Sequence, residues 1–152
     1  WATLLADSTT PIGFEFTTFP NEPKMDEMVT ESGIRFYSLC AHHLASFFGT
    51  AMVAYIPKEK RAGLSKLARA VEFYSKTLTD QETLTQNVLS LIVSELDPIG
   101  AGVCIRARHL CMESRGVCKP GVITTTSSLY GVLKTAPDAR AEFFSQLREE
   151  AL

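Results

Sequence analysis

All three histidines and two of the four cysteines of this 152-residue chain lie in two short runs. The first run is Cys40-Ala41-His42-His43, and the second is His109-Leu110-Cys111. Thiolate and imidazole are ligands that zinc prefers, and imidazole also exchanges protons near neutral pH. The two runs therefore predict a metal site in which some residues bind the ion and others transfer protons.

Two divisions of labour fit these residues. If Cys40, His43 and Cys111 bind the metal, the fourth tetrahedral position stays open for water, as in catalytic zinc sites. His42 and His109 are then left for proton transfer. If His109 binds as well, the site is closed and structural, and spacing alone does not decide between the two. A deaminase-type zinc site is disfavoured, because the chain contains neither His-x-Glu nor Pro-Cys-x-x-Cys.

The composition is typical of a single soluble domain. Hydrophobic residues make up 45% of the chain and the formal net charge is -2, so we expect neither a nucleic acid nor a membrane as a partner. No apolar run approaches the roughly 20 residues that span a bilayer, and the first six residues do not resemble a secretory signal. We expect reduced thiols and a cytoplasmic location, with Cys104 and Cys118 buried as small apolar side chains.

The elements that must position the two runs follow from the spacing of apolar residues. Prolines and turn formers predict an arm over residues 1–33, with a short helix at 1–6, followed by one domain over 34–152. Aromatic and β-branched residues predict strands at 34–39, 47–56, 101–112 and 122–133. Helical spacing predicts one helix over 64–74, with Ser65 as candidate N-cap, and others over 80–96 and 137–150.

This order of elements predicts an α+β fold, in which an antiparallel sheet has helices packed on one face. An open sheet leaves strand edges that are often paired between subunits. We therefore expect a homo-oligomer.

Five motifs resemble the GTP cyclohydrolase I family, in the same order and at similar spacings, over about residues 25–147. They are Phe36-Tyr37-Ser38-Leu39-Cys40-Ala41-His42-His43, Val53-Ala54-Tyr55-Ile56-Pro57, Gly63-Leu64-Ser65-Lys66-Leu67-Ala68-Arg69, Gln81-Glu82-Thr83-Leu84-Thr85 and His109-Leu110-Cys111-Met112-Glu113-Ser114-Arg115-Gly116-Val117. The resemblance implies a tunnelling fold over 34–152, with 1–33 an arm or a remnant of an N-terminal helical region. It also implies a ring-forming subunit, commonly in a decamer of two stacked pentamers with active sites between subunits.

The implied reaction converts GTP and water to 7,8-dihydroneopterin triphosphate and formate, the first step toward tetrahydrofolate and related pterins or deazapurines. The resemblance implies Zn²⁺ as the metal, held by Cys40, His43 and Cys111. It implies that His42 and His109 are the catalytic residues that transfer protons.

The substrate-binding residues implied by the resemblance divide by the part of GTP that they bind. Glu82 matches the carboxylate that recognises guanine, because its two oxygens can accept hydrogen bonds from the ring N–H and the exocyclic amine. Gln81 is the family's usual neighbour of that residue, although it could simply cap the helix. The triphosphate is assigned to four residues whose hydroxyl and positive charges suit phosphate oxygens, Ser65, Lys66, Arg69 and Arg115.

Two departures from the family pattern keep other functions open. Ala41 stands where the family usually has Glu, so a carboxylate beside the histidines is missing. The N-terminus stops before the family's usual N-terminal helices and a phosphate-binding arginine, from which we expect either weaker triphosphate binding or an incomplete chain. The alternatives are a related cyclohydrolase with a shifted nucleotide substrate or a formamidopyrimidine product, and a non-catalytic protein that binds zinc or guanine nucleotides.

Overall fold

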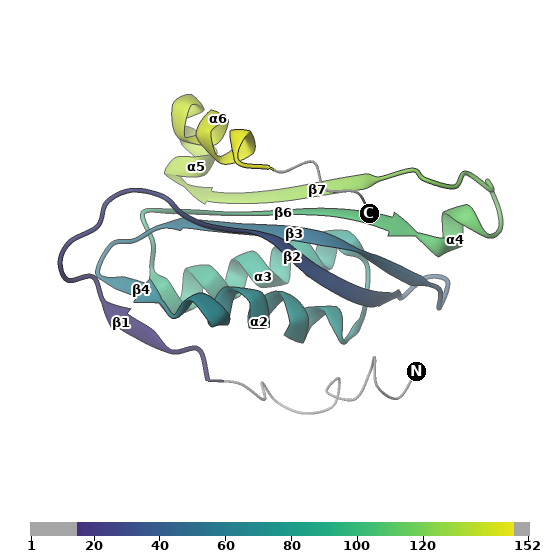
Figure 1. Ribbon diagram of the computed structural model, residues 1–152, viewed down its shortest axis with the longest axis horizontal. Coiled ribbons are helices and arrows are strands. Elements are labelled where there is room, and N and C mark those ends of the chain that lie inside the picture. Colours follow the sequence, from purple (N-terminus) through teal and green to yellow (C-terminus); the bar gives the residue numbers. More distant parts are fainter. Residues whose placement is uncertain (1–14, 148–152) are drawn as a thin grey trace.

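The structure is built around one sheet of five strands (Figure 1). The computed structural model describes residues 15–147. Within them the strand order of the main sheet is β5-β2-β3-β6-β7, and a small second sheet pairs β1 with β4. In chain order the elements are β1 (Thr18–Pro20), β2 (Val29–Cys40), β3 (Ser46–Ile56), β4 (Lys60–Ala62), α2 (Leu64–Ser75), β5 (Leu78–Thr79), α3 (Gln81–Leu96), β6 (Gly100–His109), α4 (Leu110–Glu113), β7 (Thr124–Gly131), α5 (Val132–Thr135) and α6 (Pro137–Ser145).

The register of the sheet brings the two predicted runs to the same end of the molecule. β2 pairs with β3, β3 with β6 and β6 with β7, all antiparallel, while β5 adds a short parallel pairing to the end of β2. At the end of β2, Leu39 lies opposite Ser46, and the next residue of β3, Phe47, lies opposite His109 at the end of β6. Two segments far apart in the sequence therefore meet there.

The two long helices, α2 and α3, cover one face of the sheet (Figure 1). Each has an apolar side with helical spacing, formed in α2 by Leu67 and Val71 and in α3 by Leu84, Val88 and Ile92, all fully buried. These side chains pack with those of β3 and β6 into the main core. The predicted α+β fold, with helices packed on an antiparallel sheet, is confirmed.

The opposite face of the sheet is covered at one end by the short helices α5 and α6 (Figure 1). Leu133 and Phe143 are fully buried there, in a second core that also contains Cys104. Burial of Cys104 is as predicted. The predicted C-terminal helix begins at Pro137, which suits a first turn, and it ends at Ser145 within the described residues.

The helix α3 has clear start and stop signals. The side chain of Asp80 accepts a hydrogen bond from the Thr83 backbone N–H at 2.7 Å, which satisfies one of the free donors at the helix N-terminus. Asp97 adopts a left-handed conformation, with φ of 44°, just before Pro98 ends the helix. The helix predicted over residues 80–96 is therefore confirmed.

Several local predictions differ from the structure. Gly63, not Ser65, is the N-cap of α2, because Gly63 is already extended and its carbonyl accepts from the Lys66 N–H at 2.8 Å. Cys118 is exposed rather than buried, because it lies in the loop after α4 and not in a strand.

The strands also differ in extent from their predicted ranges. β2 begins at Val29, which lies inside the segment predicted as an arm and pairs with Tyr55 of β3. The strand predicted over 101–112 ends at His109, where α4 begins, and the strand predicted over 122–133 is followed by α5 from Val132. The helix predicted at residues 1–6 lies outside the described residues. Among residues 15–147, none of the helices combines the length and apolar character needed to cross a membrane.

Candidate metal centre

Cys40, His43 and Cys111 converge at the end of the sheet next to α4. Their ligand atoms all lie within 4.8 Å of one another, and within residues 15–147 no other Cys, His or acidic cluster of this kind occurs. Cys40 Sγ lies 3.8 Å from His43 Nδ1. Cys40 is buried, Cys111 is half-buried and His43 is exposed, so the cluster is open on one side.

The geometry and donor set of this cluster fit zinc. For tetrahedral zinc, bond lengths of about 2.3 Å to sulfur and about 2.0 Å to nitrogen put neighbouring ligand atoms about 3.6 to 3.8 Å apart. Burial, followed by the neighbouring thiol of Cys40, raises the pKa of Cys111. A bound cation would oppose both effects, because it stabilises thiolates. Two crowded thiols beside an imidazole therefore form a site that favours a metal ion.

The tight turn between β2 and β3 sets the positions of Cys40 and His43. The Cys40 N–H donates to the carbonyl of Ala45, and the Leu44 N–H donates back to the carbonyl of Cys40, both at 2.9 Å. Leu44 takes a left-handed conformation with φ of 51°, which lets the chain reverse within a few residues.

His42 and Ala41 are both exposed in this turn. The Ala41 N–H donates to the carbonyl of Thr79 at 2.9 Å, which ties the turn to β5 and so to the start of α3. The pKa of Asp80 is lowered mainly by its hydrogen bond from Thr83, and the charge of His42 contributes to this lowering. No described residue forms a hydrogen bond with the His42 ring, so its ring nitrogens are available to form a hydrogen bond with a bound ligand.

His109 is held on two sides. Its ring stacks on Phe47, with centroids 4.8 Å apart and planes 1° from parallel. Its Nε2 lies 2.7 Å from Oε1 of Gln81. Burial lowers the pKa of His109, and the nearby charge of Glu82 partly opposes this. Because His109 is not part of the group of ligand atoms, the arrangement favours a three-ligand site over a closed four-ligand site.

Gln81 has more contacts than the predicted capping role would need. It is 1% exposed, and its Nε2 lies 3.0 Å from the carbonyls of Ile105 and Thr124 and 3.1 Å from Oγ1 of Thr126. The cap of α3 is Asp80 instead. Both polar atoms of the Gln81 amide are therefore engaged within the protein, while its predicted role in substrate binding stays a prediction.

Glu82 follows in the first turn of α3 and is exposed. A carboxylate is favoured at a helix N-terminus, where the backbone dipole is positive. Its charge partly opposes the lowering of the His109 pKa, so the predicted guanine-recognising group acts electrostatically on the predicted proton-transferring one. Arg115, which follows α4, lies close enough to Cys111 to lower the pKa of that thiol, although burial and Cys40 outweigh this effect.

The remaining phosphate-binding candidates lie elsewhere. Ser65, Lys66 and Arg69 are in the first turns of α2, which follows β4 at the opposite end of the sheet from α4 (Figure 1). Ser65 and Arg69 are exposed and Lys66 is half-buried. Within one chain, the structure does not bring these three residues to the metal cluster.

An ion pair beside the cluster was missed by the sequence analysis. Arg108 Nε donates to Glu113 Oε1 at 2.7 Å, and Arg108 Nη2 donates to Glu113 Oε2 at 2.6 Å. The Arg108 guanidinium also lies over the Phe48 ring, 5.6 Å from its centroid. The only sequence signal was a pair of opposite charges on either side of Cys111.

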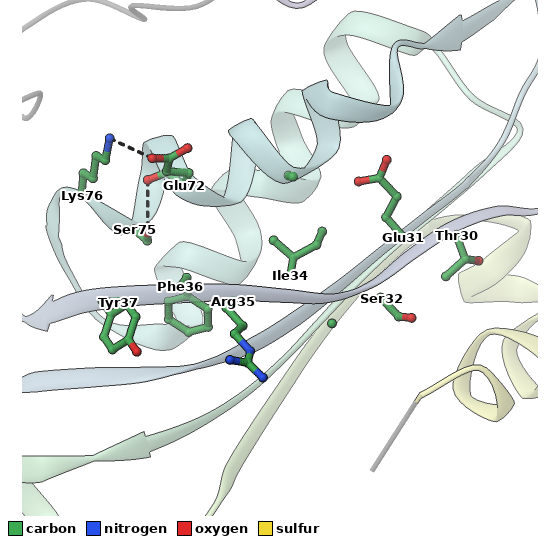
Figure 2. A pocket seen from close by; sticks show the side chains of 12 residues that line it. Thr30, Glu31, Ser32, Ile34, Arg35, Phe36, Tyr37, Glu72, Ser75 and Lys76 are labelled. Carbon is green, nitrogen blue, oxygen red and sulfur yellow. Dashed lines mark hydrogen bonds and ion pairs between the residues drawn. The ribbon is translucent and has the colours of Figure 1, made fainter. Parts of the chain in front are cut away.

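A cleft lies away from the metal cluster, along the outer edge of β2 and beside α2 (Figure 2). It has a volume of ≈ 840 Å³. Charged side chains line it, among them Glu31 and Arg35 from β2, and Glu72 of α2, which pairs with Lys76 directly after that helix. Burial raises the pKa of Glu31. None of the predicted metal ligands lines this cleft.

Comparisons with known proteins agree on one family. The family model described as GTP cyclohydrolase I matches residues 6–148. A GTP cyclohydrolase 1 from Synechococcus sp. (strain JA-3-3Ab) is 52% identical over 123 residues, which cover 81% of this chain and 54% of the relative. One from Hydrogenobaculum sp. (strain Y04AAS1) is 44% identical over 136 residues, covering 90% of this chain and 75% of the relative. The chain thus spans about half the length of the first of these relatives.

A solved structure supports the fold. The crystal structure of an archaeosine synthase QueF-Like in the apo form superposes with a TM-score of 0.55 at 19% sequence identity. The match covers 68% of this chain and 93% of that chain. At this identity the likeness concerns the arrangement of helices and strands alone.

Proposed function

The chain belongs to the GTP cyclohydrolase I family, and from this premise we propose that it is a zinc-dependent enzyme that converts GTP and water to 7,8-dihydroneopterin triphosphate and formate. The observation that carries the proposal is the open Cys40-His43-Cys111 cluster with two histidines beside it that are not among its ligand atoms. A closed structural site would have used a fourth protein ligand.

Zinc is the proposed metal because two thiols and an imidazole match its ligand preference and bond lengths. When bound, it would lower the pKa of water at the open position toward neutrality. Cys40 and Cys111 must stay reduced to act as ligands, which is consistent with a cytoplasmic protein.

The proposed catalytic work of the chain itself is proton transfer. Burial lowers the pKa of His109 and so favours its neutral form, which can accept a proton from a reacting group and return it. His42 is exposed in the turn next to the metal ligands, where it can serve a second proton transfer. Ring opening of the purine and release of formate both require such transfers.

Guanine recognition is assigned to Glu82, which is exposed at the N-terminus of α3 and close to His109. Its carboxylate can accept from the ring N–H and the exocyclic amine of guanine together, and adenine lacks that donor pair. This arrangement would hold the purine beside the residue that exchanges protons with it.

We propose that the complete site needs two copies of the chain. The helix α2, whose first turns hold Ser65, Lys66 and Arg69, begins at the opposite end of the sheet from α4, so we propose that another copy supplies these residues to the triphosphate. The main sheet offers open edges for such an assembly, because β5 covers β2 only at Leu39 and Cys40 and β7 forms the other edge. These open edges support the proposed ring-shaped homo-oligomer, which on the family pattern would be a decamer.

Ala41 motivates a second candidate function. The position is exposed beside His42 and carries no carboxylate. A missing charge next to the catalytic histidines could shift the nucleotide substrate or stop the reaction at a formamidopyrimidine. The pathway role proposed here, formation of the pterin precursor of tetrahydrofolate, requires the complete reaction.

The experiment that tests the proposal is incubation of zinc-loaded protein with GTP, measuring formate and, after oxidation, fluorescent neopterin. The expected result is equal amounts of formate and neopterin triphosphate, and loss of both in His109→Ala. Mass spectrometry across a panel of guanine nucleotides identifies the second candidate by a formamidopyrimidine or by another preferred nucleotide. Zinc binding with no turnover of any purine nucleotide would contradict both and favour a non-catalytic binding protein.

A further inference from the structure

The amide of Gln81 can adopt only one of its two orientations. Its nitrogen faces the carbonyl oxygens of Ile105 and Thr124, each 3.0 Å away. A carbonyl oxygen accepts hydrogen bonds and never donates them. If the amide were turned over, its oxygen would face both carbonyls with no hydrogen between them. Oε1 must therefore be the atom that faces His109.

The hydroxyl groups around Gln81 can be ordered in the same way. Thr85 donates its hydroxyl hydrogen to the backbone carbonyl oxygen of Gln81 at 2.7 Å. The 2.7 Å contact between the hydroxyls of Thr85 and Thr126 is then a donation from Thr126. Thr126 thus has its oxygen available to accept from Gln81 Nε2 at 3.1 Å. Every hydrogen in this buried network has an acceptor only when Gln81 Nε2 is directed toward β6 and β7.

This order determines the hydrogen on His109. Gln81 Oε1 is a pure acceptor, and it lies 2.7 Å from His109 Nε2. The ring must therefore carry its hydrogen on Nε2 when it is neutral. The other nitrogen, Nδ1, forms no hydrogen bond with any residue in 15–147 and keeps its lone pair.

We infer that Gln81 is a positioning residue that holds His109 as the Nε2–H tautomer, so that Nδ1 is the nitrogen that exchanges a proton with the bound purine nucleotide. This inference rests on the proposed function. It changes the predicted role of Gln81, because a side chain that is 1% exposed and fully engaged acts through His109 and does not touch the nucleotide.

Phe47 and Gln81 act on different movements of the ring. Stacking on Phe47 fixes the plane of the imidazole, but a half-turn of the ring about its Cβ–Cγ bond returns it to the same plane and leaves the stacking nearly unchanged. The hydrogen bond from Nε2 to Gln81 removes that half-turn, because it would put a ring carbon against Oε1. Together they leave one ring orientation and one tautomer, which is the condition for proton transfer at a fixed atom.

NMR of protein labelled with ¹⁵N in its histidine rings tests the inference directly, because the two tautomers have distinct nitrogen shifts. The sample is the zinc-loaded chain with its three histidines, assigned with single histidine variants. The wild type is expected to show His109 with its hydrogen on Nε2. Gln81→Met removes the acceptor at similar length and is expected to give a mixture of tautomers.

Steady-state kinetics separate positioning from direct binding. In Gln81→Met, kcat for GTP is expected to fall about 10- to 100-fold with little change in KM, because the nucleotide loses no contact. A rise in KM with unchanged kcat would show that Gln81 binds the substrate directly and would overturn the inference. The matched control is Gln86→Met, the same change at an exposed position of α3, which is expected to leave both constants and the His109 signals unchanged.

The outcomes also separate this inference from the proposed function. A wild-type ring with its hydrogen on Nδ1 would overturn the inference whatever the activity, and this readout does not depend on the folding of any Gln81 variant. Absence of formate from the wild type, with His109 still in the Nε2–H form, would instead contradict the proposed function.

Discussion

Arg108 and Glu113 form a two-point ion pair across the four-residue helix that carries Cys111. The two hydrogen bonds, at 2.6 and 2.7 Å, join the end of β6 to the end of α4. Glu113 is held in its charged form, since the Arg108 guanidinium lowers the pKa of this carboxyl. The ion pair therefore links the chain before Cys111 to the chain after it, and this link limits where Cys111 Sγ can move.

Breaking this ion pair is expected to weaken metal binding. Arg108→Gln should lower the affinity for zinc by about tenfold, because groups that orient a ligand typically contribute on that scale. Competition with a chromophoric chelator measures the change. Lys58→Gln is the control. It removes an exposed ion pair, 3.0 Å long, with Asp97 at the C-terminal end of α3. Equal zinc affinities of Arg108→Gln and wild type would contradict this role of the pair.

Removing the cap of α3 is expected to destabilise the protein. Asp80→Ala should lower the free energy of unfolding by about 1 kcal/mol at pH 7, because the Thr83 N–H loses its acceptor. Asp80→Asn should cost less, since asparagine also caps helices. Urea denaturation at fixed protein concentration measures both. Asp138→Ala, at an exposed first-turn acid of α6 that is not the N-cap, should stay within about 0.5 kcal/mol of wild type.

The contribution of Asp80 should also depend on pH. Its pKa is lowered in the folded state, first by the hydrogen bond from Thr83. The carboxylate therefore stabilises the fold fully above its unfolded pKa, near 4, and loses this effect as the pH falls through the lower native value. The difference between wild type and Asp80→Ala should shrink in acid. A difference that grows below pH 4 would contradict the sign of this shift.

The carboxylate of Glu82 is expected to matter for guanine nucleotides specifically. Glu82→Gln should lower kcat/KM for GTP by about 10- to 100-fold, because an amide replaces one of two acceptor oxygens and removes the charge. The rate of formate release at limiting GTP measures it. Glu95→Gln, on the last turn of the same helix, should leave kcat/KM unchanged. Retention of full kcat/KM in Glu82→Gln would remove this residue from the proposed site.

Complementation between two inactive variants tests the sharing of sites between copies. His109→Ala impairs the metal end of the chain, and Arg69→Ala impairs the start of α2 at the other end. Mixed assemblies should recover about a quarter of wild-type activity, because at random a quarter of the sites combine two intact halves. Mixtures of His109→Ala with Cys111→Ala should recover none, since both changes lie at the same end. Lack of recovery in the first mixture would contradict a shared site.

The parts of the fold that sequence reasoning predicts are those set by local patterns. The apolar spacing from Leu84 to Leu96 and the caps at Asp80 and Asp97 place α3, and alternating aromatic and β-branched residues indicate β3. Strand order and register depend on long-range pairing, so the short parallel contact of β5 with β2 had no local signal. Cys118 was predicted to be buried because its neighbour Val117 is apolar, yet a loop exposes both.

The candidate site divides in the same way. Residue types were enough to place Cys40, His43 and Cys111 in one predicted metal site, but they left His109 open as a fourth ligand. The contacts of Gln81 could not be read from its position at the start of a helix, since its partners come from β6 and β7, more than 20 residues away. The separation of Arg69 from the cluster likewise depends on which end of the sheet each helix starts from.

The meeting of Cys40 with Cys111 has a consequence for the order of events during folding. About 70 residues separate them in the chain, and only the completed β2-β3-β6 pairing brings them together. The free energy of strand pairing therefore offsets the entropic cost of closing that large loop before any metal ion binds. Tight zinc uptake should be among the last steps of maturation, and it would mark the chains that have folded correctly.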